Sequence, residues 1–322
     1  MRILKPEVFQ GNIKSKNYFE GWYFKHVSRN LENVYSFIPG ISLNQENPHA
    51  FIQIINGLTG ETHYIEYPLS AFSFDKEIFR VSIGDSIFTA DSMLLNINSP
   101  QIVIKGLLQY SKSVKYPRST FSPGIMDWYS FVPFMECKHG VVSVSHVIEG
   151  SLLIDSIKVD FSGGKGYIEK DWGKSFPASW IWLQSNTFAK SDACIMISIA
   201  KIPWLGHYFT GFLGFLYFAG NFYPFSTYNN SQITDLSLLD ERLTLSFRSK
   251  HYYLKITAAL MKTGVLLAPK SGVMNRRIKE SIDSELEVRL SDNKGREIFN
   301  DTATRAGLEV IEGIFEIVHV KQ

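Results

Sequence analysis

Short segments rich in valine, isoleucine, phenylalanine and tyrosine recur along this 322-residue chain, and they constrain its fold more than any other feature. Glycine, asparagine, aspartate or proline separates most of them, as is typical of strands joined by turns. Few stretches keep a 3.6-residue apolar period beyond two turns. The sequence therefore predicts an all-β fold, built as a sandwich or as antiparallel barrels with few short helices. Representative segments are 51–55, 102–110, 141–148, 152–159, 193–200 and 252–259.

Three turn-like sequences lie between such segments. Glu149-Gly150 predicts a tight hairpin between residues 141–148 and 152–159. Asn293-Lys294-Gly295 and Ala219-Gly220-Asn221 predict two further hairpins, because glycine and asparagine tolerate the backbone conformation that such turns need.

Composition excludes several classes of protein. Apolar residues make up 45% of the chain and charged residues 20%, which excludes global disorder. The formal net charge of +2 offers no electrostatic case for a nucleic-acid partner. Two cysteines, Cys137 and Cys194, cannot form a disulfide framework, and the N-terminus has no apolar run typical of a secretory signal. We therefore expect a cytoplasmic protein.

One stretch, residues 202–234, contains no aspartate, glutamate, lysine or arginine. Its prolines and glycines argue against a membrane-spanning helix and favour a buried β-hairpin. The alternative that stays open is a peripheral membrane contact, for which the aromatic residues 212–225 are the candidate surface.

Two segments, residues 18–25 and 166–186, place ionisable groups among aromatic side chains. A carboxyl group in such surroundings is desolvated, which raises its pKa and allows it to act as an acid. Aromatic faces also stabilise a developing carbocation, by about 0.5–2 kcal/mol per ring. The structural alternative is that Glu20 caps backbone amides and that Lys170 and Asp171 form an ion pair. The residues alone leave both interpretations open.

Known metal and nucleotide motifs are missing from the sequence. No H-E-x-x-H, P-loop or G-x-S-x-G pattern is present, and the eight histidines form no ligand-like pair. We therefore expect no metal site and no cofactor.

The two aromatic segments resemble blocks of the tocopherol cyclase family. The first block is Phe19-Glu20-Gly21-Trp22-Tyr23-Phe24, and the second contains Glu169-Lys170-Asp171-Trp172-Gly173 followed by Phe176-Pro177. The second block continues with Trp180, Trp182, Gln184 and Asn186. Asp171 departs from the family pattern, which has asparagine there, and it adds a carboxyl group beside Lys170.

The resemblance implies two packed lipocalin-like, calycin-type halves and a relationship to carotenoid hydratases. It also implies an apolar small-molecule substrate, a prenylated quinol or related isoprenoid, that closes to a chromanol-type ring after proton transfer. That activity is of the intramolecular lyase type, in the isomerase class. We place the boundary at the glycine cluster 163–166, which predicts one half over residues 1–165 and another over 166–322.

The same resemblance implies roles for individual residues. Glu20 or Asp171 is expected to be the proton donor or its orienting partner, and Lys170 is expected to tune the local charge. The expected substrate-binding residues are Trp22, Tyr23, Trp172, Trp180, Trp182, Gln184 and Asn186. Two other functions remain open: a non-catalytic carrier or sensor of an apolar ligand, and an alkene hydratase in which water traps the same cation.

Overall fold

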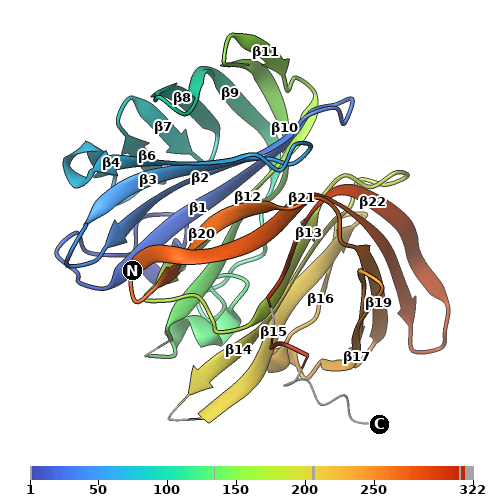
Figure 1. The fold of residues 1–322 in the computed structure, drawn as a ribbon. Coiled ribbons are helices and arrows are strands. Elements are labelled where there is room, and N and C mark those ends of the chain that lie inside the picture. The colour runs from blue at the N-terminus through green and yellow to red at the C-terminus, as the bar shows by residue number, and fades with distance from the viewer. Residues whose placement is uncertain (1, 134, 205–206, 312, 316–322) are drawn as a thin grey trace. The chain divides into compact units, whose positions relative to one another are not determined.

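A computed structural model of the protein confirms the all-β fold, with two large antiparallel sheets (Figure 1). The structure describes residues 2–133, 135–204, 207–311 and 313–315. The chain divides into two compact units. The first unit comprises residues 1–176 and 265–278, and the second comprises residues 177–264 and 279–322.

The first sheet has twelve strands in the order β4-β3-β2-β1-β12-β10-β9-β8-β7-β6-β5, with β11 paired to β10. Its strands are β1 (Tyr18–Val27), β2 (Val34–Leu43), β3 (His49–Asn56), β4 (Thr62–Pro68), β5 (Phe72–Phe74), β6 (Arg80–Ile83), β7 (Ser86–Thr89), β8 (Ser92–Asn98), β9 (Val103–Val114), β10 (Cys137–Ile154), β11 (Ile157–Asp160) and β12 (Gly164–Gly173). The order brings β12 between β1 and β10, although more than a hundred residues separate β1 from β12.

The second sheet has ten strands in the order β16-β15-β14-β13-β22-β21-β19-β18-β17, with β20 paired to β21. Its strands are β13 (Trp180–Ser185), β14 (Cys194–Trp204), β15 (His207–Phe218), β16 (Asn221–Pro224), β17 (Gln232–Leu239), β18 (Arg242–Arg248), β19 (Tyr252–Ala259), β20 (Gly264–Lys270), β21 (Val273–Asp292) and β22 (Glu297–Val310). The helices of the described residues are four short 3₁₀ turns: η1 (Arg2–Leu4), η2 (Leu69–Ala71), η3 (Asp127–Phe131) and η4 (Thr227–Asn229). None of these is long and apolar enough to cross a membrane.

Alternating side chains explain how the strands build two apolar cores. In β8 the apolar Met93, Leu95 and Ile97 are buried, while the residues between them are exposed. The core of the first unit contains such residues together with Phe24 and Phe37. The core of the second unit is of the same kind and contains, among others, Ile181, Leu183, Phe212, Phe247 and Leu308.

Two of the three predicted hairpins are confirmed. Ala219 and Gly220 join β15 to β16, with φ angles of 49° and 78°. The turn between β21 and β22 contains Gly295, whose φ is 82°. Both positions have the left-handed backbone that these turns require.

The hairpin predicted at Glu149-Gly150 is wrong. Strand β10 continues through these residues and pairs with β9, and the chain turns later, at Asp155 and Ser156, whose φ angles are 47° and 71°. Gly150 instead allows the two strands to approach closely, because a Cβ atom there would lie 2.3 Å from the Leu107 carbonyl oxygen.

The boundary between the units lies elsewhere than the glycine cluster 163–166. Residues 166–173 belong to β12, whose pairing with β1 and β10 keeps them in the first sheet. The chain leaves the first unit after Phe176, and residues 265–278 belong to the first unit again. A glycine cluster marks a turn, and a local turn signal carries no information about long-range strand pairing.

The charge-free stretch forms parts of β14, β15, β16 and β17 and the turn η4, apart from residues 205–206, which lie outside the described residues. Phe212, Phe215, Leu216 and Phe225 are buried, whereas Tyr217, Phe218, Phe222 and Tyr223 are half-buried. The stretch therefore forms the predicted β-hairpin, and its peripheral membrane contact stays a prediction.

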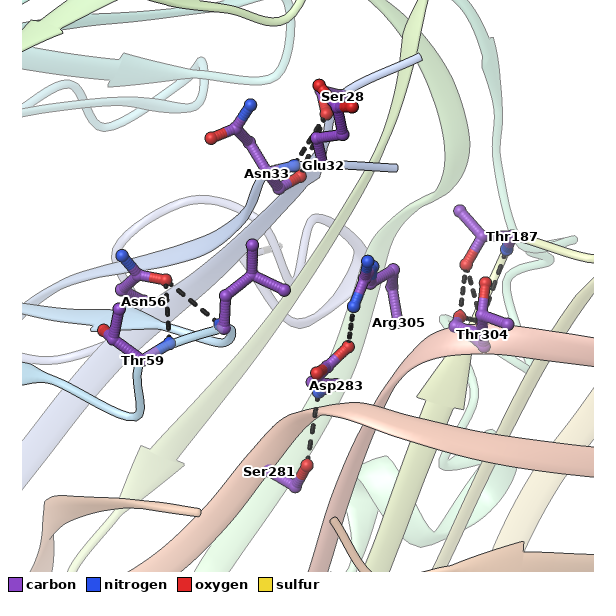
Figure 2. Close-up of polar contacts among 12 residues, drawn as sticks. Ser28, Glu32, Asn33, Asn56, Thr59, Thr187, Ser281, Asp283, Thr304 and Arg305 are labelled. Atoms are coloured by element: carbon purple, nitrogen blue, oxygen red, sulfur yellow. Dashed lines mark hydrogen bonds and ion pairs between the residues drawn. The ribbon is translucent and has the colours of Figure 1, made fainter. Parts of the chain in front are cut away.

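Polar side chains form hydrogen bonds and ion pairs at turns and within strands in both units, as Figure 2 shows. In the first unit, Oδ1 of Asn56 accepts hydrogen bonds from the Leu58 and Thr59 amides at 3.0 and 3.4 Å. In the second unit, Asp283 forms an ion pair with Arg305, and its backbone N–H donates to Oγ of Ser281 at 3.2 Å.

Two buried imidazoles lie inside the core of the first unit. Nε2 of His26 lies 2.7 Å from the Tyr110 hydroxyl, and Nδ1 of His146 lies 2.9 Å from Oγ of Ser143. Burial lowers the pKa of His146 to about 3, so this ring is neutral at physiological pH. Its ring packs over Gly166, where a Cβ atom would lie 2.0 Å from Nε2 of His146.

We predict that Gly166→Ala destabilises the protein by about 1–3 kcal/mol, because the added methyl group collides with a confined ring. Gly21→Ala is the matched control, since its Cβ would meet only ordinary contacts at 3.8 and 3.9 Å. Chemical denaturation should show the loss for Gly166→Ala and a change within about 0.5 kcal/mol for Gly21→Ala. Equal stability of the two variants would contradict the packing described for His146.

Candidate functional site

Strand β12 presents two chemically different faces. Its side chains alternate, so Lys170 and Trp172 lie on one face while Glu169 and Asp171 lie on the other. The register places Trp22 of β1 opposite Lys170. Each face therefore collects its own partners from β1 and β10.

A buried ion pair occupies the first face. Nζ of Lys170 contacts Oε1 of Glu20, and both side chains are fully buried. The same ammonium group donates hydrogen bonds to the backbone oxygens of Pro6 and Val8 at 2.8 and 2.6 Å. It also lies 4.7 and 4.9 Å from the ring centroids of Trp22 and Trp172, which is cation–π distance. Burial lowers the pKa of Lys170, and the neighbouring carboxylate of Glu20 opposes that shift.

Both carboxylate oxygens of Glu20 are occupied by donors. The Gln10 amide donates to them at 2.9 and 3.1 Å, and the Gly11 amide donates to Oε2 at 3.0 Å. The Tyr18 hydroxyl donates to the same oxygen at 2.5 Å. With Lys170 included, this donor set matches the structural interpretation in which Glu20 caps backbone amides, and it leaves Glu20 without an oxygen for a substrate.

The ion pair fastens the N-terminal segment, residues 5–11, to the sheet. Nε1 of Trp22 donates to the Glu7 carbonyl oxygen at 2.8 Å, and the Glu7 side chain forms an ion pair with Arg118 at 2.7 Å. Together with the bonds from Lys170 and Glu20, these contacts bind the carbonyl oxygens of residues 6–8 and the amides of residues 10 and 11. Glu20, Lys170, Trp22 and Trp172 thus form one cluster, which we call the latch.

The second face carries a cluster of titratable groups centred on His139 of β10. Nδ1 of His139 lies 2.9 Å from Oδ1 of Asp171, and Nε2 lies 3.5 Å from Oε2 of Glu169. The Tyr167 hydroxyl donates to Oε2 of Glu169 at 2.7 Å. The thiol of Cys137 lies 3.8 Å from Oδ1 of Asp171. We call His139, Glu169 and Asp171 the acid cluster.

Two carboxylates keep the imidazole of His139 protonated at neutral pH. Burial opposes the charged ring, but Asp171 and Glu169 outweigh burial and raise the pKa of His139 to about 9. Burial, reinforced by Asp171, also raises the pKa of the Cys137 thiol, so it stays protonated and is a poor nucleophile. The acid cluster therefore keeps a proton on His139, beside Asp171, at neutral pH.

Asp171 is the member of the acid cluster most open to a ligand. Its side chain is 25% exposed, whereas those of His139 and Glu169 are 12% and 5% exposed. Its Oδ1 is held by His139, and within the described part of the chain its Oδ2 has no hydrogen-bond partner. Asp171 can therefore offer one oxygen to a reacting molecule while the other stays fixed.

The acid cluster is also the group, among the residues that the structure describes, with ligand atoms close enough for a metal, all within 4.8 Å of one another. In the structure Asp171 contacts Nδ1 of His139 and Glu169 contacts Nε2, so both ring nitrogens already face carboxylates.

Tyr23 of β1 is buried and stands opposite Glu169, so it lies on the same face of the sheet as the acid cluster. The remaining candidate residues belong to the second unit. In the second unit, Trp180, Trp182 and Gln184 alternate along β13 with the core residues Ile181 and Leu183, so they point away from that core.

These residues of the second unit have polar or close contacts. Nε1 of Trp180 donates to Oε2 of Glu309, and Nε2 of Gln184 lies 3.8 Å from the Cys194 sulfur. The ring of Trp182 packs over Gly307. Asn186 follows β13 directly and is buried.

Comparison with known proteins gives a family and a fold. A family model described as tocopherol cyclase-like matches residues 89–312, more than half of the chain. A probable chloroplastic tocopherol cyclase of Oryza sativa subsp. japonica and a chloroplastic tocopherol cyclase of Zea mays are each 26% identical over 195 residues. Those alignments cover 57% of this chain and only 41% of each relative.

Solved structures support the fold alone. The crystal structure of CghA with Sch210972 superposes with a TM-score of 0.56 at 11% identity, covering 91% of this chain and 88% of the other. A putative AttH from Nitrosomonas europaea has a TM-score of 0.50 at 11% identity, covering 90% and 92%.

For the latch, we predict that Lys170→Met destabilises the protein by about 3–5 kcal/mol, because it leaves the buried carboxylate of Glu20 without its cation. The double variant Glu20→Gln/Lys170→Met should lose less, since no buried charge remains. Chemical denaturation measures both, with the exposed Lys158→Met as control. A double variant less stable than Lys170→Met would contradict the ion pairing.

The acid cluster predicts a fall in stability at alkaline pH. The pKa of His139 is about 9 in the folded protein and about 6.5 when unfolded, so its contribution is complete below pH 6.5 and is lost as pH rises through 9. We expect His139→Gln to remove up to about 3 kcal/mol of this pH dependence between pH 6.5 and 9.5. Denaturation at both pH values measures it, and identical slopes for the two proteins would refute the assignment.

Proposed function

The chain belongs to the tocopherol cyclase-like family, and on that premise we propose that it is an enzyme that closes a ring in a prenylated quinol or a related isoprenoid. The reaction is an intramolecular addition of a phenol to an alkene, started by proton transfer. The observation that carries the proposal is the acid cluster, in which Asp171, with one free oxygen, is bonded to a protonated His139.

Proton transfer from the acid cluster is the first step. The Asp171–His139 pair holds one proton, on the imidazolium of His139, and gives that proton to the less substituted carbon of the double bond nearest the aromatic head, so that a tertiary carbocation forms at the other carbon and His139 is left neutral beside the Asp171 carboxylate. Asp171 orients His139 through Oδ1 and relays the proton toward the alkene. Because Asp171 and Glu169 raise the pKa of His139, the Asp171–His139 pair holds its proton near neutral pH.

Ring closure completes the reaction. The phenolic oxygen attacks the tertiary cation and forms the carbon–oxygen bond, and the phenolic proton returns to the Asp171–His139 pair. The product is an isomer of the substrate, so the reaction needs no oxidant, reductant or cofactor. The acid is regenerated in each cycle, as intramolecular lyase chemistry requires.

Glu20 is the less suitable donor of the two carboxyl groups. Its oxygens are occupied by Lys170, by backbone amides and by Tyr18. In our proposal Glu20 and Lys170 therefore support the site by holding the N-terminal segment, and Asp171 performs the chemistry. The binding role of the aromatic and amide residues stays part of the proposal: Trp22, Tyr23, Trp172, Trp180, Trp182, Gln184 and Asn186.

We predict that Asp171→Asn lowers ring closure about 10²–10⁴-fold, the range typical of losing a general acid. Purified protein is incubated with a prenylated quinol, and chromanol is measured by chromatography and mass spectrometry. Glu20→Gln is the comparison variant, and its folded fraction should keep kcat within about tenfold of wild type. Turnover by Asp171→Asn at the wild-type rate, or a greater loss in Glu20→Gln, would overturn the assignment.

The same assay separates the other two functions. An alkene hydratase would give a product heavier by one water, with oxygen-18 incorporated from labelled water. A carrier would return the quinol unchanged after long incubation while binding it in native mass spectrometry. Either result in place of chromanol would refute the cyclase proposal.

A further inference from the structure

Three segments of the first unit leave the sheet at the same end. The register pairs Phe19, at the start of β1, with Gly173 at the end of β12, and Gly173 with Cys137 at the start of β10. The segments that adjoin these strand ends are residues 11–17, 115–136 and 174–176. The Glu136 carbonyl oxygen accepts the Lys174 amide at 2.7 Å, which joins two of them.

Large apolar side chains are exposed in these segments. Phe121, Trp128 and Phe131 are 84%, 52% and 42% exposed, and Ile13 is 49% exposed. A single exposed apolar side chain is ordinary, but three exposed aromatic residues within eleven positions of one loop are not. Exposed aromatic groups of this kind mark a surface that is covered by a partner.

The loop that carries the aromatic residues is fixed to the sheet. Nζ of Lys138 donates to the Ser130 carbonyl oxygen at 2.8 Å, and the His139 amide contacts the Met126 sulfur at 3.0 Å. These bonds hold both ends of η3, the turn that contains Trp128. Trp128 and Phe131 are therefore exposed on an anchored turn, and Phe121 precedes that turn in the same loop.

Basic side chains outnumber acidic ones in the same three segments. Lys14, Lys16, Lys115 and Lys174 are exposed, and exposed Glu136 and half-buried Asp127 oppose them. The excess of lysine complements an anionic surface such as that of a bilayer with anionic lipid headgroups. Tryptophan and phenylalanine favour the boundary between lipid headgroups and acyl chains.

We propose that this end of the first sheet docks on an anionic lipid bilayer, with Phe121, Trp128 and Phe131 inserted at the headgroup level and the lysines against the phosphates. The docking does not rest on the proposed reaction. It does place the membrane beside His139, two residues from the start of β10, where an apolar substrate would arrive. This surface differs from residues 212–225, whose aromatic side chains are buried or half-buried.

The test is flotation of the full-length protein with phosphatidylcholine vesicles, with and without phosphatidylglycerol. Wild type should float with the anionic vesicles and only weakly with the neutral ones. The triple variant Phe121→Ser/Trp128→Ser/Phe131→Ser should bind at least about tenfold more weakly. Ile157→Ser is the matched control and should bind like wild type, because Ile157 is 70% exposed at the start of β11, just beyond the far end of β10.

A charge variant keeps the test decisive if the aromatic variant folds poorly. Lys14→Glu/Lys16→Glu/Lys174→Glu changes only exposed side chains and should abolish the preference for anionic vesicles. Wild type that does not float, or triple variants that float like wild type, would overturn the proposal. A lipid-free wild-type dimer that the aromatic variant converts to a monomer, with vesicle binding unchanged, would assign the surface to a second copy instead.

Discussion

The pairing of β12 between β1 and β10 is the constraint on which the rest of the first unit depends. Because side chains alternate along a strand, that single placement separates Lys170 from its sequence neighbour Asp171. Lys170 meets Glu20 and the N-terminal segment, while Asp171 meets His139. A shift of one residue would exchange the two faces, leaving the carboxylates of one cluster and the ammonium of the other without partners.

Two carboxyl groups in similar sequence surroundings have different chemistry because their partners differ. Glu20 is enclosed by an ammonium group, two backbone amides and a phenol, which suits a structural anchor. Asp171 is hydrogen-bonded through Oδ1 to the protonated imidazole of His139, and its Oδ2 stays open. Reactivity therefore follows from which oxygens are left free, and the aromatic character of the sequence around each carboxyl group does not distinguish them.

The sequence predicts the strands and the family well, because apolar alternation and the two aromatic blocks are local features. It predicts poorly which side chains contact one another. Lys170 and Asp171 are adjacent, yet they point to opposite faces and form no pair with each other. The sequence gives no reason to place His139 beside Asp171, which lies 32 positions away, and only the β10–β12 register shows that they meet. Gly150 shows the same limit, since its close approach to β9 is a long-range property.

Titration of His139 by nuclear magnetic resonance tests the central claim most directly, with His139→Gln used to assign its signal. If Asp171 and Glu169 keep the imidazole protonated, its pKa is about 9 in wild type and falls toward the ordinary 6.5 in Asp171→Asn. A wild-type pKa at or below 6.5, or one that Asp171→Asn leaves unchanged, would contradict the proposed acid.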